Sequence, residues 1–461
     1  MKKAGNRGSE PADEERRREN LLQQFRRSYG RDAQFVTRAP GRVNLLGEHT
    51  DYNGLPVLPM AIDRNTLIAG AARRDLQVNV KNLDSSFAPR SFELAKSIPA
   101  FAAGDWGNYT KAAAQGLALH AGKTLRHGAD LLVDGNIPHG AGLSSSSALV
   151  VATALALLAA NERHESPETL AEILPGAERY VGTLSGGMDH AISLLAEAGH
   201  ALRIDFFPLR TRPVPLPSGY DIIVCHSLVQ AEKSAAAKRH YNHRVIECRL
   251  ACRLLDVALG TGLPRDLTML GDLATLFPGR SLSEFVAYLS PWLPDRPLSL
   301  AEIATYIGAP VDALQVQCQV PPGLSDAFAV VRRARHVLTE AERVGQAEEA
   351  LGAGDAGAFA SLMDASHASC RDDYEISCRE IEDLIRASKD GGALGARLTG
   401  AGFGGCTVSL VDRSRTAEFL KHVDRHFYAQ RLADERHIEQ YRFVFRPRGG
   451  ATSQRLEAIT S

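Results

Sequence analysis

Residues 138–148 read PHGAGLSSSSA, and this segment constrains the fold and chemistry of the chain most. It follows a predicted strand over residues 129–134 and precedes an apolar run that predicts a helix. Gly140 and Gly142 allow a tight turn and a close approach of the backbone to a ligand. Four serines then occupy the helix start, where free N–H groups and the helix dipole favour an anion. One serine would suffice as a cap, so the segment predicts a phosphate site.

This segment is neither of the two common nucleotide loops. No lysine follows the glycines in the frame of a Walker A loop, and their spacing is not that of a dinucleotide-binding G-x-G-x-x-G. A dehydrogenase or other redox protein would need such a dinucleotide loop, and this class is therefore not expected.

A second segment, GEHTDYNG at residues 47–54, places Glu48, His49 and Asp51 within four positions. Glycines bound these side chains on both sides. Three interpretations are open from the residues alone: a metal site, a catalytic acid/base pair, and a solvated surface turn.

Two further glycine-bearing segments accompany these. Residues 178–190, ERYVGTLSGGMDH, place Asp189 in the first turn of a predicted helix. Such an aspartate is often only a cap or a dipole partner, but Gly186 and Gly187 would clear space for a substrate beside its carboxylate. Residues 398–406, LTGAGFGGC, form a loop between two predicted strands. Together with the serine segment, this loop suggests a second wall of a nucleotide site.

The composition is that of an ordinary globular protein. The 461 residues include 53 Lys+Arg and 54 Asp+Glu, a net charge of −1, so no basic footprint for a nucleic acid is expected. The longest nearly apolar run, residues 148–160, is broken only by Thr153 and is too short for a membrane span. Residues 1–20 are charged and do not resemble a signal peptide. Seven scattered cysteines suit a reducing compartment, so a cytoplasmic location is expected.

The alternation of strand-like and helix-like segments predicts an α+β fold. Strands are predicted over residues 34–43, 66–72, 77–82, 129–134, 201–207, 221–226, 395–399, 406–411 and 442–446. Helices are predicted to begin after Ser144, Pro167, Met188, Lys238, Ser325 and Asp355.

Domain limits are predicted from composition. The charged residues 1–20 predict a disordered tail. A proline-rich stretch at residues 210–219 predicts a boundary, because proline interrupts a strand ladder. Residues 262–322, short helical pieces punctuated by prolines, look like an insertion in the second half.

Taken together, the segments resemble the GHMP small-molecule kinases, and within them the galactokinases. Residues 41–53, GRVNLLGEHTDYN, are similar to the galactokinase signature, PHGAGLSSSSA to the phosphate loop, and LTGAGFGGC to the third family motif. The resemblance implies two domains, residues 21–212 and 213–461, with the active site in the cleft between them. The first would be a ribosomal-protein-S5-like domain and the second a ferredoxin-like domain.

The resemblance also implies residue roles. Asp189 is the expected catalytic base, with Arg42 beside it. ATP and Mg²⁺ are the expected nucleotide and metal, and a sugar is the expected substrate; no oligomeric state is predicted. The sugar would be bound by Glu48, His49, Asp51, Gly187 and Tyr241. The nucleotide would be bound by Trp106, Tyr109, Gly140, Gly142, Leu143, Ser144 and Ser145, and Mg²⁺ by Ser146 and Glu178. In isolation, Trp106 and Tyr109 would be interpreted as core residues.

The expected activity is ATP-dependent phosphorylation of the anomeric hydroxyl of galactose. The motifs resemble the branch that holds plant galactokinases and animal N-acetylgalactosamine kinases, so the same reaction on N-acetylgalactosamine is the alternative. A catalytically silent sugar sensor is less expected, because the serine loop is complete and Asp189 and Arg42 are both present. Two residues depart from the family pattern: His190 replaces the usual glutamine after the aspartate, and His139 replaces an aliphatic residue.

Overall fold

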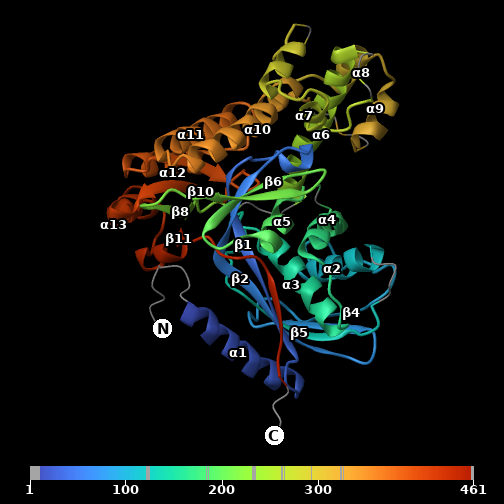
Figure 1. The fold of residues 1–461 in the computed structure, drawn as a ribbon, viewed down its shortest axis with the longest axis vertical. Coiled ribbons are helices and arrows are strands. Elements are labelled where there is room, and N and C mark those ends of the chain that lie inside the picture. The colour runs from blue at the N-terminus through green and yellow to red at the C-terminus, as the bar shows by residue number, and fades with distance from the viewer. Residues whose placement is uncertain are drawn as a thin grey trace.

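A computed structural model describes residues 11–120, 125–182, 184, 186–230, 235–260, 263, 265–291, 293–321, 324 and 327–457, without the side chains of residues 11, 178, 179 and 235–238. Two large β-sheets, of six and four strands, form its framework (Figure 1). Helices and a two-stranded hairpin complete it. The α+β class predicted from the sequence is confirmed.

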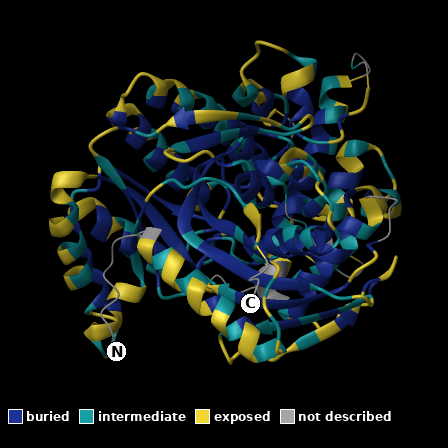
Figure 2. Ribbon diagram, turned by 60° about the horizontal axis from the view of Figure 1, so that its bottom comes forward, coloured by how far each residue is buried: buried dark blue, intermediate teal, exposed yellow. Residues whose placement is uncertain are grey.

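The six-stranded sheet has the order β12-β1-β2-β5-β3-β4, in which only β3 and β5 pair in parallel. Its long central strands are buried along nearly their whole length because both faces are covered (Figure 2). Along β5, Leu131 and Val133 enter the main core, whereas Leu132 packs under α1 on the other face. The strands are β1 (Phe35–Leu46), β2 (Leu58–Ala72), β3 (Gln77–Asn82), β4 (Arg90–Glu93), β5 (Ala129–Gly135) and β12 (Thr452–Arg455).

Four helices lie against the main-core side of this sheet. The central one, α3, is apolar on all sides and largely buried, and it packs on β1 and β2. These helices are α2 (Gly107–His120), α3 (Ser145–Ala160), α4 (Pro167–Glu178) and α5 (Met188–Leu195).

The four-stranded sheet is antiparallel, with the order β11-β8-β10-β9. Val224 and Leu410 of this sheet belong to the same buried cluster as Leu45 and Met60 of the first sheet, so the two halves share one core. Its elements are β8 (Tyr220–His226), β9 (Gly395–Thr399), β10 (Cys406–Asp412) and β11 (Arg442–Phe445), with helices α10 (Val330–Gly352), α11 (Ala356–Asp372), α12 (Arg379–Asp390) and α13 (Thr416–Val423).

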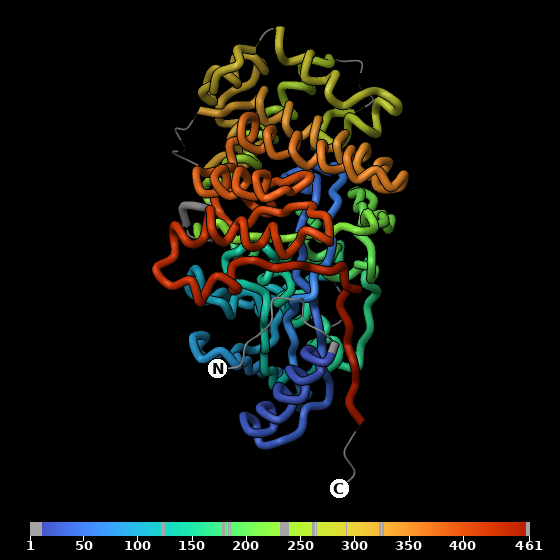
Figure 3. The backbone as a smooth tube through the Cα atoms, turned by 90° about the vertical axis from the view of Figure 1, so that its left-hand side faces the viewer, coloured from blue at the N-terminus to red at the C-terminus, as the bar shows by residue number. Residues whose placement is uncertain are grey.

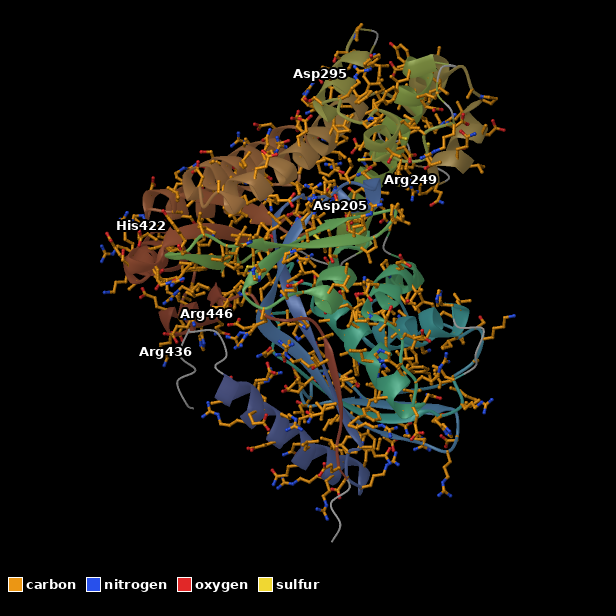
Figure 4. All side chains as sticks on the ribbon, viewed as in Figure 1. Asp205, Arg249, Asp295, His422, Arg436 and Arg446 are labelled. Carbon is orange, nitrogen blue, oxygen red and sulfur yellow. The ribbon has the colours of Figure 1, made fainter. Side chains whose placement is uncertain are left out.

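The proline-rich stretch forms a strand. β6 (His200–Asp205) and β7 (Arg210–Pro215) make a two-stranded hairpin, so the boundary predicted at 212/213 falls within β7. Pro213 and Pro215 are tolerated because β7 has a ladder partner on one side only, and residues two apart share the unpaired side. Arg203 donates to Asp205 (2.9 Å) and to Glu348 of α10 (2.6 Å), which joins the hairpin to the second half. Asp205 is labelled in Figure 4.

The predicted insertion is helical in its described residues and lies at one end of the molecule (Figure 1). It packs on α6 and α10 and shares one apolar cluster with them. Arg249 of α6 donates to Gln319 (2.9 Å), and Arg335 of α10 pairs with Asp295 (3.5 Å; Figure 4). The elements here are α6 (Ala235–Leu259), α7 (Asp272–Leu276), a 3₁₀ helix (Leu282–Tyr288), α8 (Leu300–Ile307) and α9 (Val311–Cys318).

Both ends of the described chain differ from expectation. The disordered tail predicted for residues 1–20 is wrong for residues 11–20, which begin helix α1 (Pro11–Tyr29); residues 1–10 lie outside the described part. The helix is held by buried Leu21 and Phe25 and by Arg17, which donates to Asp134 (2.9 Å). At the other end, β12 leaves the second half and pairs with β1 (Figure 3). Among the described residues, no helix has the length and apolar character to cross a bilayer.

Candidate active site

The separate sequence motifs meet at one cavity of about 690 Å³. A cavity of this size suits a small-molecule substrate with a cofactor. Every predicted site residue lines it except Gly187 and Glu178; the Glu178 side chain lies outside the described residues. The predicted residues on the wall are Arg42, Glu48, His49, Asp51, Trp106, Tyr109, Gly140, Gly142, Leu143, Ser144, Ser145, Ser146, Asp189 and Tyr241.

The serine loop has the geometry of an anion site. Gly140 (φ 67°), Gly142 (φ 73°) and Ser144 (φ 60°) adopt left-handed conformations that fold the loop tightly before α3. Ser144 is the N-cap residue of α3, but its side chain makes no capping hydrogen bond. The first turn of a 16-residue helix therefore faces the cavity without a side-chain cap, which favours a bound phosphate.

Asp189 is held in place by the serine loop and β1. Arg42 Nε donates to Oδ1 of Asp189 (2.8 Å), and Ser144 Oγ donates to Oδ2 (2.5 Å). Arg42 also donates to the Gly142 carbonyl, so one guanidinium connects the carboxylate to the loop. The side chain of Asp189 remains 26% exposed and can be reached from the cavity. Charge-assisted bonds of this kind fix a carboxylate in one orientation.

Of the paired glycines before Asp189, Gly186 lines the cavity beside that carboxylate and Gly187 does not. A Cβ atom on Gly186 would lie 2.2 Å from Oδ2 of Asp51, and one on Gly187 would lie 2.8 Å from Cε1 of Phe206. Protein atoms therefore occupy the positions that a side chain at either glycine would need. The glycines allow the segment that carries Asp189 to pack directly on the 47–54 turn, and the Met188 N–H donates to Asp51 (3.3 Å).

The 47–54 turn is buried, which excludes the surface-turn interpretation. His49 has a left-handed backbone (φ 62°), an unfavourable conformation for a residue with a side chain. Its Nδ1 bonds Tyr52 Oη (2.9 Å), and its Nε2–H donates to the Ala401 carbonyl (3.3 Å). Burial, with the nearby His336, lowers the pKa of His49 to about 3, so the ring is neutral near pH 7. Among the described residues, no three His, Cys, Asp or Glu side chains are grouped as a metal site.

The two acids of the turn have different surroundings. Burial raises the pKa of Glu48, and the opposing guanidinium of Arg397 lies 2.9 Å away. Burial, and then the charge of Asp189, raise the pKa of Asp51 to about 6. Both acids line the cavity beside Tyr241, so the turn presents a row of polar groups to a bound molecule.

The third glycine loop forms the second wall, as expected. Gly400, Ala401, Gly402 and Phe403 line the cavity. A Cβ atom on Gly400 would lie 2.8 Å from the carbonyl oxygen of Gly142, so this loop packs directly on the serine loop. The close approach of two backbones explains the glycine at this position.

Several cavity residues were not predicted from the sequence. Phe87 stands beside Trp106 (5.8 Å between ring centres) and His139 (5.2 Å), which extends the predicted aromatic pair. Phe87 belongs to no motif, and no signal in the sequence distinguishes it from other loop residues. The other unpredicted lining residues include Asn82, Asp84 and Gln230.

Comparison with known proteins agrees with this geometry. Three protein-family models match the chain. The model described as "Galactokinase galactose-binding signature" matches residues 23–72, "GHMP kinases N terminal domain" matches residues 108–197, and "GHMP kinases C terminal" matches residues 347–429. A galactokinase of Dictyostelium discoideum is 36% identical and covers 95% of this chain and 93% of its own length. One of Roseiflexus sp. (strain RS-1) is 38% identical, with 90% of this chain and 91% of that protein covered.

Solved structures give the same family. The galactokinase of Lactococcus lactis complexed with galactose is 27% identical, covers 94% of this chain and 99% of that chain, and superimposes with a TM-score of 0.75. A mevalonate kinase, 15% identical with a TM-score of 0.52, shares the fold; 85% of this chain and 96% of that chain are covered. The expected two-part GHMP kinase fold is confirmed. The chain belongs to the galactokinase family of the GHMP kinases.

Proposed function

We propose that this chain transfers the terminal phosphoryl group of ATP to the anomeric hydroxyl of galactose, giving galactose 1-phosphate and ADP. The observation that carries the proposal is the meeting of three parts in one cavity: the serine loop, the 47–54 turn and the Asp189–Arg42 pair. Galactokinases cover nearly the whole chain at 36–38% identity, and one solved relative was complexed with galactose.

Asp189 is the proposed catalytic base. Its carboxylate would accept the proton as the sugar O–H bond breaks and the new P–O bond forms, while the bond from phosphorus to the ADP oxygen breaks. Arg42 orients this carboxylate from 2.8 Å. Because it also contacts the serine loop, its positive charge lies between the base and the phosphate site.

The serine loop is the proposed binding site for the ATP phosphates. Backbone N–H groups at the start of α3 would hold the phosphate oxygens, and the glycines let the backbone come close enough to do so. The aromatic group formed by Phe87, Trp106 and Tyr109 lies in the same cavity and would pack against the adenine ring of ATP.

A Mg²⁺ ion is proposed to accompany ATP. When bound, it neutralises phosphate charge and aligns the transferred group. Mg²⁺ on a nucleotide takes few protein ligands, preferably oxygen, which fits the cavity-lining hydroxyl of Ser146. Glu178 remains the second proposed ligand; it ends α4.

The 47–54 turn is the proposed site of sugar selection. Carboxylates of Glu48 and Asp51 and the hydroxyl of Tyr241 would pair with adjacent sugar hydroxyls. His49 can join only by sharing its Nε2–H, which already bonds Ala401 in the described structure. A sugar of the wrong stereochemistry would make fewer of these hydrogen bonds and would therefore bind less tightly.

A sugar panel with ATP and Mg²⁺ tests the proposal. Galactose, N-acetylgalactosamine, glucose and mannose are added separately, and ADP release is followed together with the sugar 1-phosphate. We expect turnover with galactose well above that with the other three. A preference for N-acetylgalactosamine would make that sugar the proposed substrate. Absence of turnover with all four sugars would contradict the proposed reaction and favour a sensor.

A further inference from the structure

A fully buried polar cluster lies directly behind the 47–54 turn, which is called the sugar turn below. Glu340 and His336 of α10 and Arg397 of β9 are each 0% exposed, and none of them lines the cavity. All three nevertheless contact Gly47 or Glu48. Glu48 lines the cavity, and Gly47 is the residue before it. No part of the proposed mechanism uses these side chains, so their cost of burial calls for another explanation.

Glu340 holds the backbone of the turn. Its Oε1 accepts hydrogen bonds from the N–H groups of Gly47 (2.9 Å) and Glu48 (3.3 Å) and from the hydroxyl of Ser366 (2.6 Å). Its Oε2 accepts from Arg343 Nε (2.6 Å). Burial alone would raise the pKa of Glu340, but the charges of Arg343 and Arg397 hold it well below its usual range. Glu340 is therefore a charged, fully satisfied acceptor.

The other two side chains hold Glu48 at different atoms. His336 Nε2–H donates to the Glu48 carbonyl (3.0 Å), while its Nδ1 accepts from Ser369 (2.9 Å). Burial lowers the pKa of His336 to about 4, so a neutral ring with this tautomer is expected near pH 7. Arg397 donates to the Glu48 carboxylate (2.9 Å) and to the Asn44 carbonyl (3.1 Å).

Glu48 is thus fixed at its N–H, its carbonyl and its carboxylate, each time by the second half of the molecule. The next residue, His49, has the left-handed backbone noted above, which its surroundings must maintain. Glu340 is the member that reaches the main-chain N–H groups just before this residue.

We propose that Glu340 is a positioning residue for sugar binding: it holds the Gly47–Glu48 backbone so that Glu48, His49 and Asp51 face the sugar. This inference rests on the proposed sugar kinase function. It predicts that loss of Glu340 weakens the sugar half of the site and spares the nucleotide half, because Glu340 contacts the turn and not the serine loop.

Glu340→Ala and Glu340→Gln test the inference through separate KM values for galactose and ATP, with galactose binding by calorimetry as a measurement free of turnover. For Glu340→Ala we expect the KM and Kd for galactose to rise about tenfold or more, because charged hydrogen bonds to the backbone are lost. The KM for ATP should change less than twofold. Glu340→Gln keeps an acceptor oxygen and should recover part of the loss.

Asp130→Ala is the matched control for lost stability. Asp130 is also buried (5% exposed) and accepts from Arg31, Arg73 and Asn79, but it lies in β5 away from the turn. The Asp130→Ala substitution should lower the midpoint temperature of thermal unfolding without raising the Kd for galactose. If Glu340→Ala does not fold, Glu340→Gln decides, with an expected rise in the galactose Kd of more than twofold.

The outcomes separate the two proposals. An unchanged galactose Kd in a folded Glu340 variant, or an equal rise in the galactose and ATP constants, overturns the positioning role and leaves the proposed function intact. A parent protein that binds no galactose overturns both. If another sugar proves to be the substrate, its own Kd replaces that of galactose in the same comparison.

Discussion

The serine loop and the sugar turn form the two halves of one cavity, but they are held in different ways. The serine loop takes much of its shape from its own residues: Gly140, Gly142 and Ser144 have left-handed backbones, and a helix begins immediately after them. Arg42 of β1 adds a hydrogen bond to the Gly142 carbonyl. The sugar turn is held from outside, by side chains that come from 288 to 349 positions further along the chain. Local residues do much to shape the serine loop, whereas the row of polar groups on the 47–54 turn depends on distant side chains.

The largest expected effect is on Asp189, which lies where the two halves meet. Asp189→Ala should lower kcat about 10²- to 10⁴-fold, the usual contribution of a positioned base. Nucleotide and sugar binding should remain, because Arg42 and Ser144 stay in place on β1 and the serine loop. Steady-state kinetics and calorimetric titration with each ligand measure both. A variant that keeps more than a tenth of the parent kcat would contradict the role.

The next effect tests the distant support of the sugar turn. Arg397→Met should reduce the free energy of unfolding by about 3–5 kcal/mol, because it leaves the Glu48 carboxylate buried without its partner. Arg413→Met is the control: its pair with Asp221 is exposed on the arginine side (62%) and should contribute less than about 1 kcal/mol. Urea unfolding of both variants checks this. Equal losses would remove the distinction between the two pairs.

The same difference explains how much of the molecule could be predicted from its sequence. The strands at 77–82 and 395–399 were predicted at their observed bounds, because period and composition are local signals. Helix α1 was not predicted, because its charged residues obscure the two buried positions, Leu21 and Phe25. β7 was missed because its prolines were taken for a break rather than an edge strand.

The candidate site divides in the same way. The serine loop, Asp189 and the third glycine loop were predicted from short motifs, and the structure brings them together. The ion pair of Glu48 with Arg397 was not predicted, because no pattern in a single sequence joins side chains 349 positions apart. The close approach of Gly186 to Asp51 was not predicted, because Asp51 lies in a different segment of the sequence.

A smaller effect concerns the titration of Asp51. Its pKa is about 6 in the folded protein and its ordinary value is 3.8, so the folded state holds this proton more tightly. Its contribution to stability is therefore complete below about pH 4 and is lost as the pH rises through 6. Asp51→Asn resembles the protonated form. Its free energy of unfolding should therefore rise by roughly 1–3 kcal/mol relative to that of the parent between pH 4 and pH 8. Denaturant unfolding at both pH values measures this. No relative gain would show that Asp51 titrates normally.

The smallest expected effect tests the locally built half. Ser146→Ala should raise the Mg²⁺ concentration for half-maximal activity about tenfold, equivalent to about 1.4 kcal/mol for one lost oxygen ligand. The KM for galactose should change less than twofold, because the sugar turn is supported from elsewhere. Thr153→Ala, on the same helix and fully buried, is the control and should leave both values unchanged. An unchanged Mg²⁺ titration would remove Ser146 from the proposed ligands, and backbone N–H groups would then be the main means by which the serine loop holds the phosphates. A shift in the galactose KM instead would show that the two halves are mechanically coupled, and that the serine loop helps to support the sugar turn.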